Sequence, residues 1–429
     1  MSIVELQEWQ DTFLPNIVLS TADQRLVKSL YGVEIREMRD GVYIKAASWI
    51  GVVRFDAFTL RIRPKLTNID IMRMLLVAGG LERLRRYRAT RDYELRDIDV
   101  SLFDLIALLL ADACTFIAKA GLLRGYVIEE EDLSVVRGSL RIAEQIRRRY
   151  GQVNRLECRY DEHNADVIEN RILHTALALC RRYVQQPLVR NRIQRLLDTF
   201  AAASQPLDGD WRVIRSEMSY NRLNSHYQEA HSLAWIVMAG LNVQDILAAG
   251  STRGFAFLLD MNPLFEKFVE VLVRSVLHND HIDIQAQVTS TGHIWDVEHN
   301  QTYKRIRPDL LLTTRTDLRL AIDAKYKRYD TQKLHEGDIY QTFLYTYAFR
   351  NAAVDKLPSA LLIYPADLPS KKPTRLHIRD NRGAIQARLH ALGIDIPIAL
   401  DGLFNANREH VDQTYSDIRY AIQCLLDWV

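Results

Sequence analysis

The stretch RIRPDLLLTTRTDLRLAIDAKYKRYD, residues 305–330, decides the fold of the C-terminal part of this chain. Its apolar residues alternate with polar ones on either side of a polar turn, which is a pattern that predicts a half-buried β-hairpin. The charges fall at unusual places for such a hairpin. Asp309, Asp323 and Lys325 are spaced so that their side chains could meet on one face.

The register of the hairpin depends on the length of its loop. A three-residue loop, 315–317, places Asp309 directly opposite Asp323. Opposed β-carbons are then roughly 4.5–5.5 Å apart, a distance at which like charges destabilise a strand pair. The strand period of two places Lys325 on the face of Asp323 and leaves the other face wholly apolar. A four-residue loop would instead pair Asp309 with Ile322 and put the two acids on different faces.

Two carboxylates held this close raise each other's pKa unless a cation joins them. A divalent metal relieves the repulsion, and oxygen-only ligands favour Mg²⁺, with Mn²⁺ as a substitute, over zinc. We therefore expect Asp309 and Asp323 to be metal ligands and catalytic residues for phosphodiester hydrolysis. We expect Lys325 to position or activate the attacking water, or to offset charge on the pentacovalent phosphorane. The alternative is a surface hairpin whose charges face solvent, but the apolar opposite face and the flanking helices favour a metal site.

This arrangement resembles the PD-(D/E)xK nuclease superfamily. RPD at 307–309 matches the PD half of its motif, and DAK at 323–325 matches the (D/E)xK half. The resemblance implies a further acidic metal ligand on the preceding helix, where Glu266 and Glu270 lie four apart on one face, and we prefer Glu266. It also implies a catalytic glutamine in the next helix, Gln341, that orients a water or a substrate phosphate; a solvated helix position is the alternative for Gln341.

The likeness extends along most of residues 45–365. The segments LRIRPKL, MRMLLVAGGL, VRGSLRIAEQIRR and CRYDEHNADVIENRILHTAL in the N-terminal half are similar to the McrC family. So are FAFLLDMNPLFEKFV, RIRPDLLL, AIDAKYK, DIYQTFLYTYA and LLIYP in the C-terminal half. McrC is the nuclease subunit of McrBC modification-dependent restriction systems, which act in antiphage defence.

The pattern along the chain predicts an α/β protein, α+β in its entirety, with three regions. Residues 1–100 are expected to be β-rich, and the resemblance implies that they are a partner-binding region. Residues 101–250 are expected to form a helical middle region. Residues 251–429 are expected to form a PD-(D/E)xK endonuclease domain, in which a central mixed sheet is flanked by helices.

The resemblance implies a division of labour. It implies a partner, a McrB-like AAA+ GTPase hexamer that reads methylated cytosine and uses the GTP. The absence of a GxxxxGK[ST] phosphate loop from this chain fits that arrangement. This chain is expected to stimulate that GTPase and to cut double-stranded DNA as an Mg²⁺-dependent endonuclease. Because one site cuts one strand, dimerisation through the nuclease domain is expected for a double-strand break. The rivals are a free-standing DNA-processing nuclease and a non-catalytic activator of the GTPase.

Composition sets the remaining bounds. The 56 basic and 54 acidic residues give a net charge of +2, which excludes a histone-like polycation but allows local basic clusters. Two such clusters, 83–97 and 141–159, are candidates for contact with DNA phosphates or with the GTPase, and solvated helix faces are the alternative. Scattered cysteines, an N-terminus unlike a signal peptide and charges within the apolar run 102–123 predict a cytoplasmic protein with no membrane span.

Overall fold

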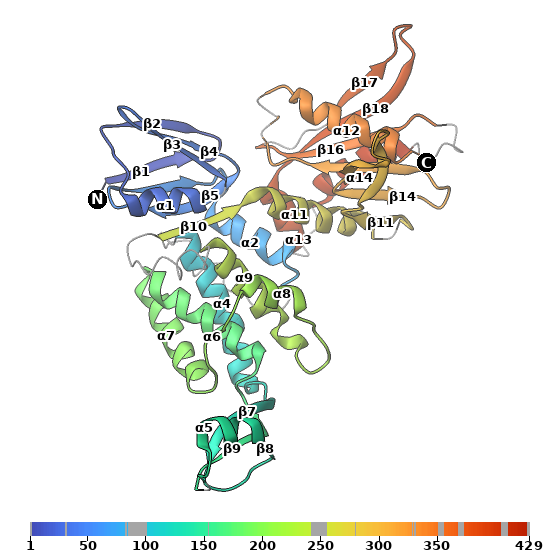
Figure 1. Cartoon of the computed structure of the whole chain (residues 1–429). Coiled ribbons are helices and arrows are strands. Elements are labelled where there is room, and N and C mark those ends of the chain that lie inside the picture. Colours follow the sequence, from blue (N-terminus) through green and yellow to red (C-terminus); the bar gives the residue numbers. More distant parts are fainter. Residues whose placement is uncertain are drawn as a thin grey trace.

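The chain folds into an α/β structure, which we describe from a computed structural model. The description covers residues 2–30, 32–81, 84, 101–152, 154–241, 255–278, 280–327, 329, 332–350, 356–367, 373–404 and 411–426. Figure 1 shows an N-terminal group of strands, a helical middle and a C-terminal sheet covered by helices. The α/β fold class predicted from the sequence is confirmed.

Two small sheets at the start of the chain share one apolar core. Strand β6 shows how the sequence builds it, because Phe58, Leu60 and Ile62 point inward while Thr59 and Arg61 alternate with them and stay partly exposed. The first sheet has the order β1 (Ser2–Gln7), β6 (Phe58–Arg63), β5 (Trp49–Arg54), β10 (Phe255–Asp260). The second has the order β2 (Asp11–Pro15), β4 (Gly41–Ala46), β3 (Val33–Met38), and helix α1 (Thr21–Ser29) connects β2 to β3.

Strand β10 differs from the prediction, which assigned residues 251–429 to the nuclease domain. It pairs antiparallel with β5, so residues 255–260 complete the N-terminal sheet and not the nuclease sheet. The predicted boundary at residues 250–254 lies outside the described residues. A pairing between strands some two hundred residues apart leaves no local signal in the sequence, which is why periodicity alone misassigned this strand.

The middle of the chain is an assembly of helices around the largest core. Its central helix, α4, was the apolar run considered for a membrane span, but it is buried among other helices and its Asp112 pairs with Arg192 at 2.7 Å. No helix among the described residues is long and apolar enough to cross a membrane. The elements are α2 (Asn68–Ala78), α4 (Leu102–Ala120), α6 (Ile168–Tyr183), α7 (Pro187–Ala201), α8 (Trp211–Glu217), η2 (Ser225–Tyr227) and α9 (Gln228–Gly240).

A small β unit interrupts the helical region that was predicted for residues 101–250. It projects from the end of the helices that lies farthest from the C-terminal sheet (Figure 1). It consists of β7 (Gly125–Leu133), β8 (Ser139–Leu140), α5 (Ile142–Arg149) and β9 (Leu156–Asn164). We call residues 125–164 the projecting unit.

The C-terminal part contains a six-stranded mixed sheet with helices on both faces, as predicted for a nuclease domain. One face packs against α11 and α14, and the other packs against α12. In spatial order the strands are β11 (Asp283–Ala286), β14 (Leu310–Thr313), β15 (Arg319–Ala324), β16 (Ser359–Pro365), β18 (Ile385–Ile394) and β17 (Thr374–Arg379). The remaining elements are α11 (Met261–Val276), the hairpin β12 (Ser290–Asp296) and β13 (Gln301–Ile306), α12 (Glu336–Ala348), α13 (Ile396–Phe404) and α14 (Val411–Leu426).

Candidate active site

The hairpin of β14 and β15 has the predicted register. Leu310 lies opposite Ile322 and Leu312 opposite Leu320, so the hairpin is centred on residue 316. The loop is the three-residue one, with Asp317 in the left-handed region at φ 55°. The regular ladder begins at Leu310, and Asp309 lies directly before it, across from Asp323. The four-residue loop is excluded.

The surroundings of the hairpin differ from the half-buried strand pair that the alternation predicted. Leu311 and Ala321, on the face expected to be polar, are buried in a cluster with Tyr345 and Phe349 around helix α12. The charged groups therefore lie at the ends of strands that are buried on both faces. Asp323 is 1% exposed, which excludes the solvent-facing alternative.

Asp309, Asp323 and Lys325 meet at one point. The backbone N–H of Ala324 donates a 2.7 Å hydrogen bond to Asp309 Oδ2. Lys325 Nζ lies 3.1 Å from Asp323 Oδ2. The backbone N–H of Lys325 donates to the carbonyl oxygen of Ile363 at 2.9 Å, so the chain stays attached to β16 beyond the end of β15.

The electrostatics of this group are those of a buried carboxylate pair. Burial raises the pKa of Asp323 to about 7, and the charge of Asp309 adds to this while Lys325 opposes it. Burial also raises the pKa of Asp309, although hydrogen bonds from Ala324 and Gln287 work in the other direction. Burial acts to lower the pKa of Lys325, but the two aspartates outweigh it, so this pKa is raised and the ammonium form is retained.

Helix α11 brings Glu266 to the same site and directs Glu270 away from it. Burial raises the pKa of Glu266 to about 7, and Asp309 contributes as the nearest like charge. Glu270 instead pairs with Lys267 at 2.7 Å and with Arg274 at 3.0 Å on the outer face of the helix. The structure thus places the preferred acid, Glu266, beside the aspartates.

Gln341 on α12 is also in the site and is not a solvated position. Its Oε1 accepts a 3.2 Å hydrogen bond from Lys325 Nζ, and its Nε2 donates to the hydroxyl of Tyr345 at 2.6 Å. Tyr345 in turn donates to the carbonyl oxygen of Arg307 at 3.1 Å. The ring of Tyr345 is buried, and its hydroxyl holds the glutamine in place.

Two residues of the site were missed from the sequence. Gln287, directly after β11, donates from Nε2 to Asp309 Oδ1 at 3.2 Å and to Glu266 Oε2 at 3.4 Å. Its backbone N–H also donates to the carbonyl oxygen of Asp309 at 2.9 Å. Asp338, in the first turn of α12, lies 2.8 Å from Lys327 Nζ and accepts a hydrogen bond from Tyr329. Neither residue stands in a local motif that could have revealed it.

The residues present fit a divalent cation held by two aspartates. Apart from the contact with Lys325, Asp323 Oδ2 is buried and accepts no hydrogen bond from the described residues. All the acidic donors are oxygens, as Mg²⁺ and Mn²⁺ require. Among the described residues, no three His, Cys, Asp or Glu side chains are grouped closely enough to hold a metal ion. Glu266 and Asp309 instead both accept hydrogen bonds from Gln287. Glu266 as a third ligand stays a prediction.

Comparison with known proteins identifies the family. A family profile described as the McrBC 5-methylcytosine restriction system component matches residues 44–365, three quarters of the chain. The chain belongs to this family. The assignment to McrC made from the sequence is therefore confirmed, and the matched range includes every residue of the site described above. No curated protein matches the chain.

Comparison with solved structures shows the same fold in a known complex. A half-complex of Thermococcus gammatolerans McrB AAA+ hexamers with bound McrC contains a chain that matches with a TM-score of 0.62 and 19% identity. The match covers 98% of this chain and 100% of that one, so the fold is shared from end to end. The Thermococcus gammatolerans McrBC complex matches with a TM-score of 0.43 and 21% identity over 64% of this chain and 88% of that chain.

Proposed function

We propose that this McrC family member is the endonuclease subunit of a McrBC-type restriction complex. It hydrolyses phosphodiester bonds of methylcytosine-containing DNA with Mg²⁺, under the control of a GTP-driven AAA+ partner whose GTPase it stimulates. The observation that carries the proposal is the meeting of Asp309, Asp323 and Lys325 at the end of β15, with Glu266 and Gln341 beside them.

The protein groups have distinct tasks in this proposal. Asp309 and Asp323 hold the cation, and Mg²⁺, when bound, supplies Lewis-acid polarisation of a phosphate oxygen. Lys325, held between Asp323 and Gln341, donates from its ammonium group to the attacking water or to a phosphate oxygen, which offsets the charge that develops there. Gln341 fixes the direction of that ammonium group because its own amide is tied to Tyr345.

The partner is proposed from the family and from the surface of the chain. The Thermococcus gammatolerans structure contains McrB AAA+ hexamers with bound McrC. In this chain the basic cluster 141–159 lies on the projecting unit, far from the nuclease sheet, as Figure 1 shows. Large apolar side chains are exposed there, with Tyr150 at 86% and Ile142 at 64%. Apolar groups exposed among basic ones suit a protein interface better than a DNA backbone, so we assign this unit to the GTPase. The second basic cluster, 83–97, lies almost wholly outside the described residues.

Two copies are needed for a double-strand break because each nuclease site cuts one strand. We propose that a second copy is brought to the DNA through the nuclease domain. The number of cut strands per binding event, measured as linear against nicked product from a supercoiled plasmid, tests this: a single acting site gives nicked circles only.

The test of the function uses the purified chain with its candidate GTPase, Mg²⁺ and GTP on methylated and unmethylated plasmid. Linear product is expected only when all components are present and the DNA is methylated. Equal cleavage by the chain alone without GTP would favour the free-standing nuclease. Stimulated GTP hydrolysis with intact plasmid would favour a non-catalytic activator.

A further inference from the structure

A pocket of about 170 Å³ lies at the carboxyl ends of three neighbouring strands of the nuclease sheet. Strands β15, β16 and β18 run parallel, and the residues that follow each of them line one wall of the pocket. In open α/β sheets the crevice outside the carboxyl ends of the strands is where ligands bind. The pocket therefore occupies a position that the fold favours for binding, and the mechanism above does not use it.

The opposite wall comes from the turn after β1, the connection between β6 and α2, and the start of α2, and hydrogen bonds join the two walls. The hydroxyl of Tyr326 donates to Glu8 Oε1 at 3.0 Å, and the backbone N–H of Lys65 donates to the same oxygen at 2.7 Å. Glu8 and Tyr326 are both buried. Trp9, the neighbour of Glu8, stands at the edge of the pocket with its side chain 40% exposed. The two regions of the chain that form the pocket are therefore joined by buried hydrogen bonds to Glu8.

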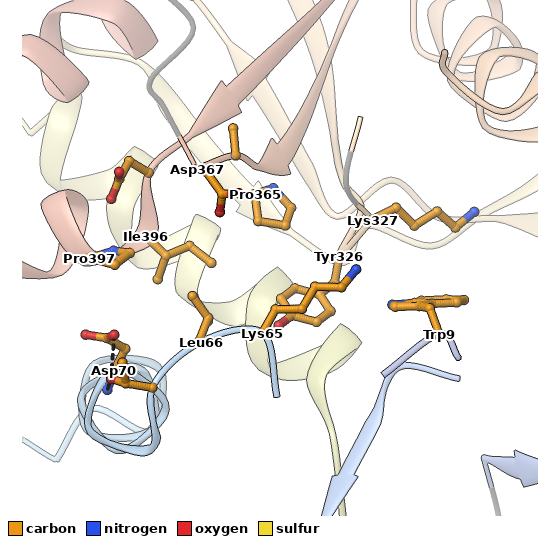
Figure 2. Close-up of a pocket in the computed structure, with 13 residues that line it drawn as sticks. Trp9, Lys65, Leu66, Asp70, Tyr326, Lys327, Pro365, Asp367, Ile396 and Pro397 are labelled. Carbon is orange, nitrogen blue, oxygen red and sulfur yellow. Dashed lines mark hydrogen bonds between the residues drawn. The ribbon is translucent and has the colours of Figure 1, made fainter. Parts of the chain in front are cut away.

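The lining is polarised from one end to the other. Lys65, Lys327 and Trp9 lie at one end in Figure 2, and Asp70 lies at the other. Asp395 lies with Asp70 in the lining, and burial raises its pKa, to which Asp367 and Asp70 also contribute. Apolar side chains, among them Leu66 and Ile396, line the middle together with a third carboxylate, Asp367.

The order of the lining groups, from lysines and a tryptophan at one end to carboxylates at the other, suits the chemistry of a single nucleotide. A nucleobase has flat apolar faces that stack on aromatic rings, and its amino group donates to carboxylates. Its phosphate is anionic and suits two lysines; Lys327 keeps donors for it although it already lies 2.8 Å from Asp338. The volume of 170 Å³ holds a single ring system, since a cavity of about 150 Å³ holds benzene.

We propose that this pocket receives one nucleobase of the DNA strand, unstacked from its neighbours, next to the phosphate that the nuclease cuts. The proposal rests on the proposed function, since Lys327 is two residues beyond Lys325 and its backbone N–H donates to the carbonyl oxygen of Lys325 at 2.8 Å. The base stacks on Trp9, its amino edge faces Asp70 and Asp395, and its phosphate lies at the lysines. Trp9 has φ 67° and is the third residue of a turn in which the backbone N–H of Gln10 donates to the carbonyl oxygen of Gln7 at 3.1 Å.

The experiment measures binding of short labelled single strands to the full chain in EDTA, where no cleavage occurs. Trp9→Ala removes the stacking surface, and Ala366→Leu adds bulk at a residue that lines the pocket. Each change is expected to weaken binding of oligo-deoxycytidine about tenfold. Trp295→Ala, which removes a tryptophan of similar exposure on β12, is expected to bind like the parent. Oligo-deoxythymidine, which lacks the amino group, is expected to bind the parent more weakly than oligo-deoxycytidine.

Parental affinity in both pocket variants would overturn the proposal, and equal affinity for the two homopolymers would overturn the orientation of the base. If free dCMP displaces the oligonucleotide and binds with the same affinity as the oligonucleotide, the occupant of the pocket is a free nucleotide and the proposal is overturned. Intact DNA binding together with lost stimulation of the GTPase partner would assign the pocket to a protein segment and contradict our assignment. Asp323→Asn separates the two proposals, because it is expected to abolish cleavage without weakening binding in EDTA. If the parent protein binds the oligonucleotides but cleaves no DNA, the proposed nuclease function is contradicted and the proposed base pocket is not.

Discussion

Asp309 accepts a hydrogen bond at 2.7 Å from the backbone N–H of Ala324, the residue between Asp323 and Lys325. The first half of the motif is thereby fixed to the second half through the main chain. The side chain of Asp309 serves two purposes at once, because it satisfies a buried N–H and presents its other oxygen to the site. Substitutions of Asp309 can separate its hydrogen bond to Ala324 from its role in the site.

Asp309→Asn and Asp309→Ala are expected to differ in stability and not in activity. The asparagine keeps an oxygen that can accept from Ala324, whereas the alanine leaves a buried N–H without a partner, at a cost of about 1–3 kcal/mol. Both remove the charge that a cation needs, so both should abolish most cleavage. Chemical unfolding of the metal-free proteins checks this, and equal stability of the two variants would contradict the role given to the hydrogen bond.

Lys325→Gln is expected to reduce the rate of cleavage without loss of metal binding. The ammonium group lies 3.1 Å from Asp323 and 3.2 Å from Gln341, so it is directed at the site and not at solvent. Loss of a positioned proton donor lowers rates by about 10²–10⁴-fold. The measurement is the single-turnover rate at saturating Mg²⁺, with calorimetric titration of Mn²⁺ alongside. Lys304→Gln, on the exposed side of β13, is the matched control; a similar loss there would point to a general charge effect.

Gln341→Ala and Tyr345→Phe are expected to lower the same rate through Lys325. Both changes leave the metal-binding carboxylates in place but break the chain that runs from Lys325 through Gln341 and Tyr345 to the backbone of Arg307. Mutation of residues that orient a catalytic group in this way typically lowers activity by about 10–100-fold. In a Lys325→Gln background the additional loss should largely disappear, because the group that they orient is gone. Additive losses would show that they act independently.

Glu266→Gln is expected to make the metal-free protein more stable at pH 8 but not at pH 5. The pKa of Glu266 is raised to about 7 in the folded chain, above its ordinary value of 4.5, so between these values the folded state binds more protons than the unfolded state. Stability from this group is therefore present at low pH and is lost as pH rises through 7. Thermal unfolding in EDTA at the two pH values measures it. If the thermal stability of the variant depends on pH in the same way as that of the parent, the raised pKa assigned to the buried Glu266 is contradicted.

The same carboxyls predict the pH dependence of activity at limiting Mg²⁺. The pKa of Asp323 is also raised to about 7, and a protonated carboxyl does not bind the cation. Cleavage should therefore rise between pH 6 and pH 8, and higher Mg²⁺ should move the rise to lower pH. A profile that does not respond to the concentration of Mg²⁺ would mean that these carboxyls are not the ligands.

The sequence was sufficient for the hairpin because its information is local. Strand alternation and the length of the loop together determine which residues face each other, so the pairing of Leu310 with Ile322 followed without any tertiary contact. The resemblance implied an acidic residue on this helix without deciding between Glu266 and Glu270. The structure gives a physical reason for preferring Glu266 in the lysine and arginine that hold Glu270 outside the site.

The parts that escaped prediction depend on contacts between distant segments. Gln287 reaches Asp309 only because β11 pairs with β14, and nothing near Gln287 in the sequence indicates that pairing. The burial of Leu311 and Ala321 depends in the same way on helix α12 packing over the hairpin. The joining of Glu8 to Tyr326 connects segments more than three hundred residues apart, and no periodicity encodes it.

The central claim is that catalysis lies at the end of β15 and that activation of the GTPase lies elsewhere in the chain. The most direct measurement follows cleavage of methylated plasmid and GTP hydrolysis in the same tubes for the parent, Asp323→Asn and Asp317→Asn. The last variant makes the same chemical change in the exposed loop of the same hairpin. The account predicts that Asp323→Asn loses cleavage, keeps full stimulation of GTP hydrolysis, and that Asp317→Asn retains both. Cleavage by Asp323→Asn at the parental rate would contradict it.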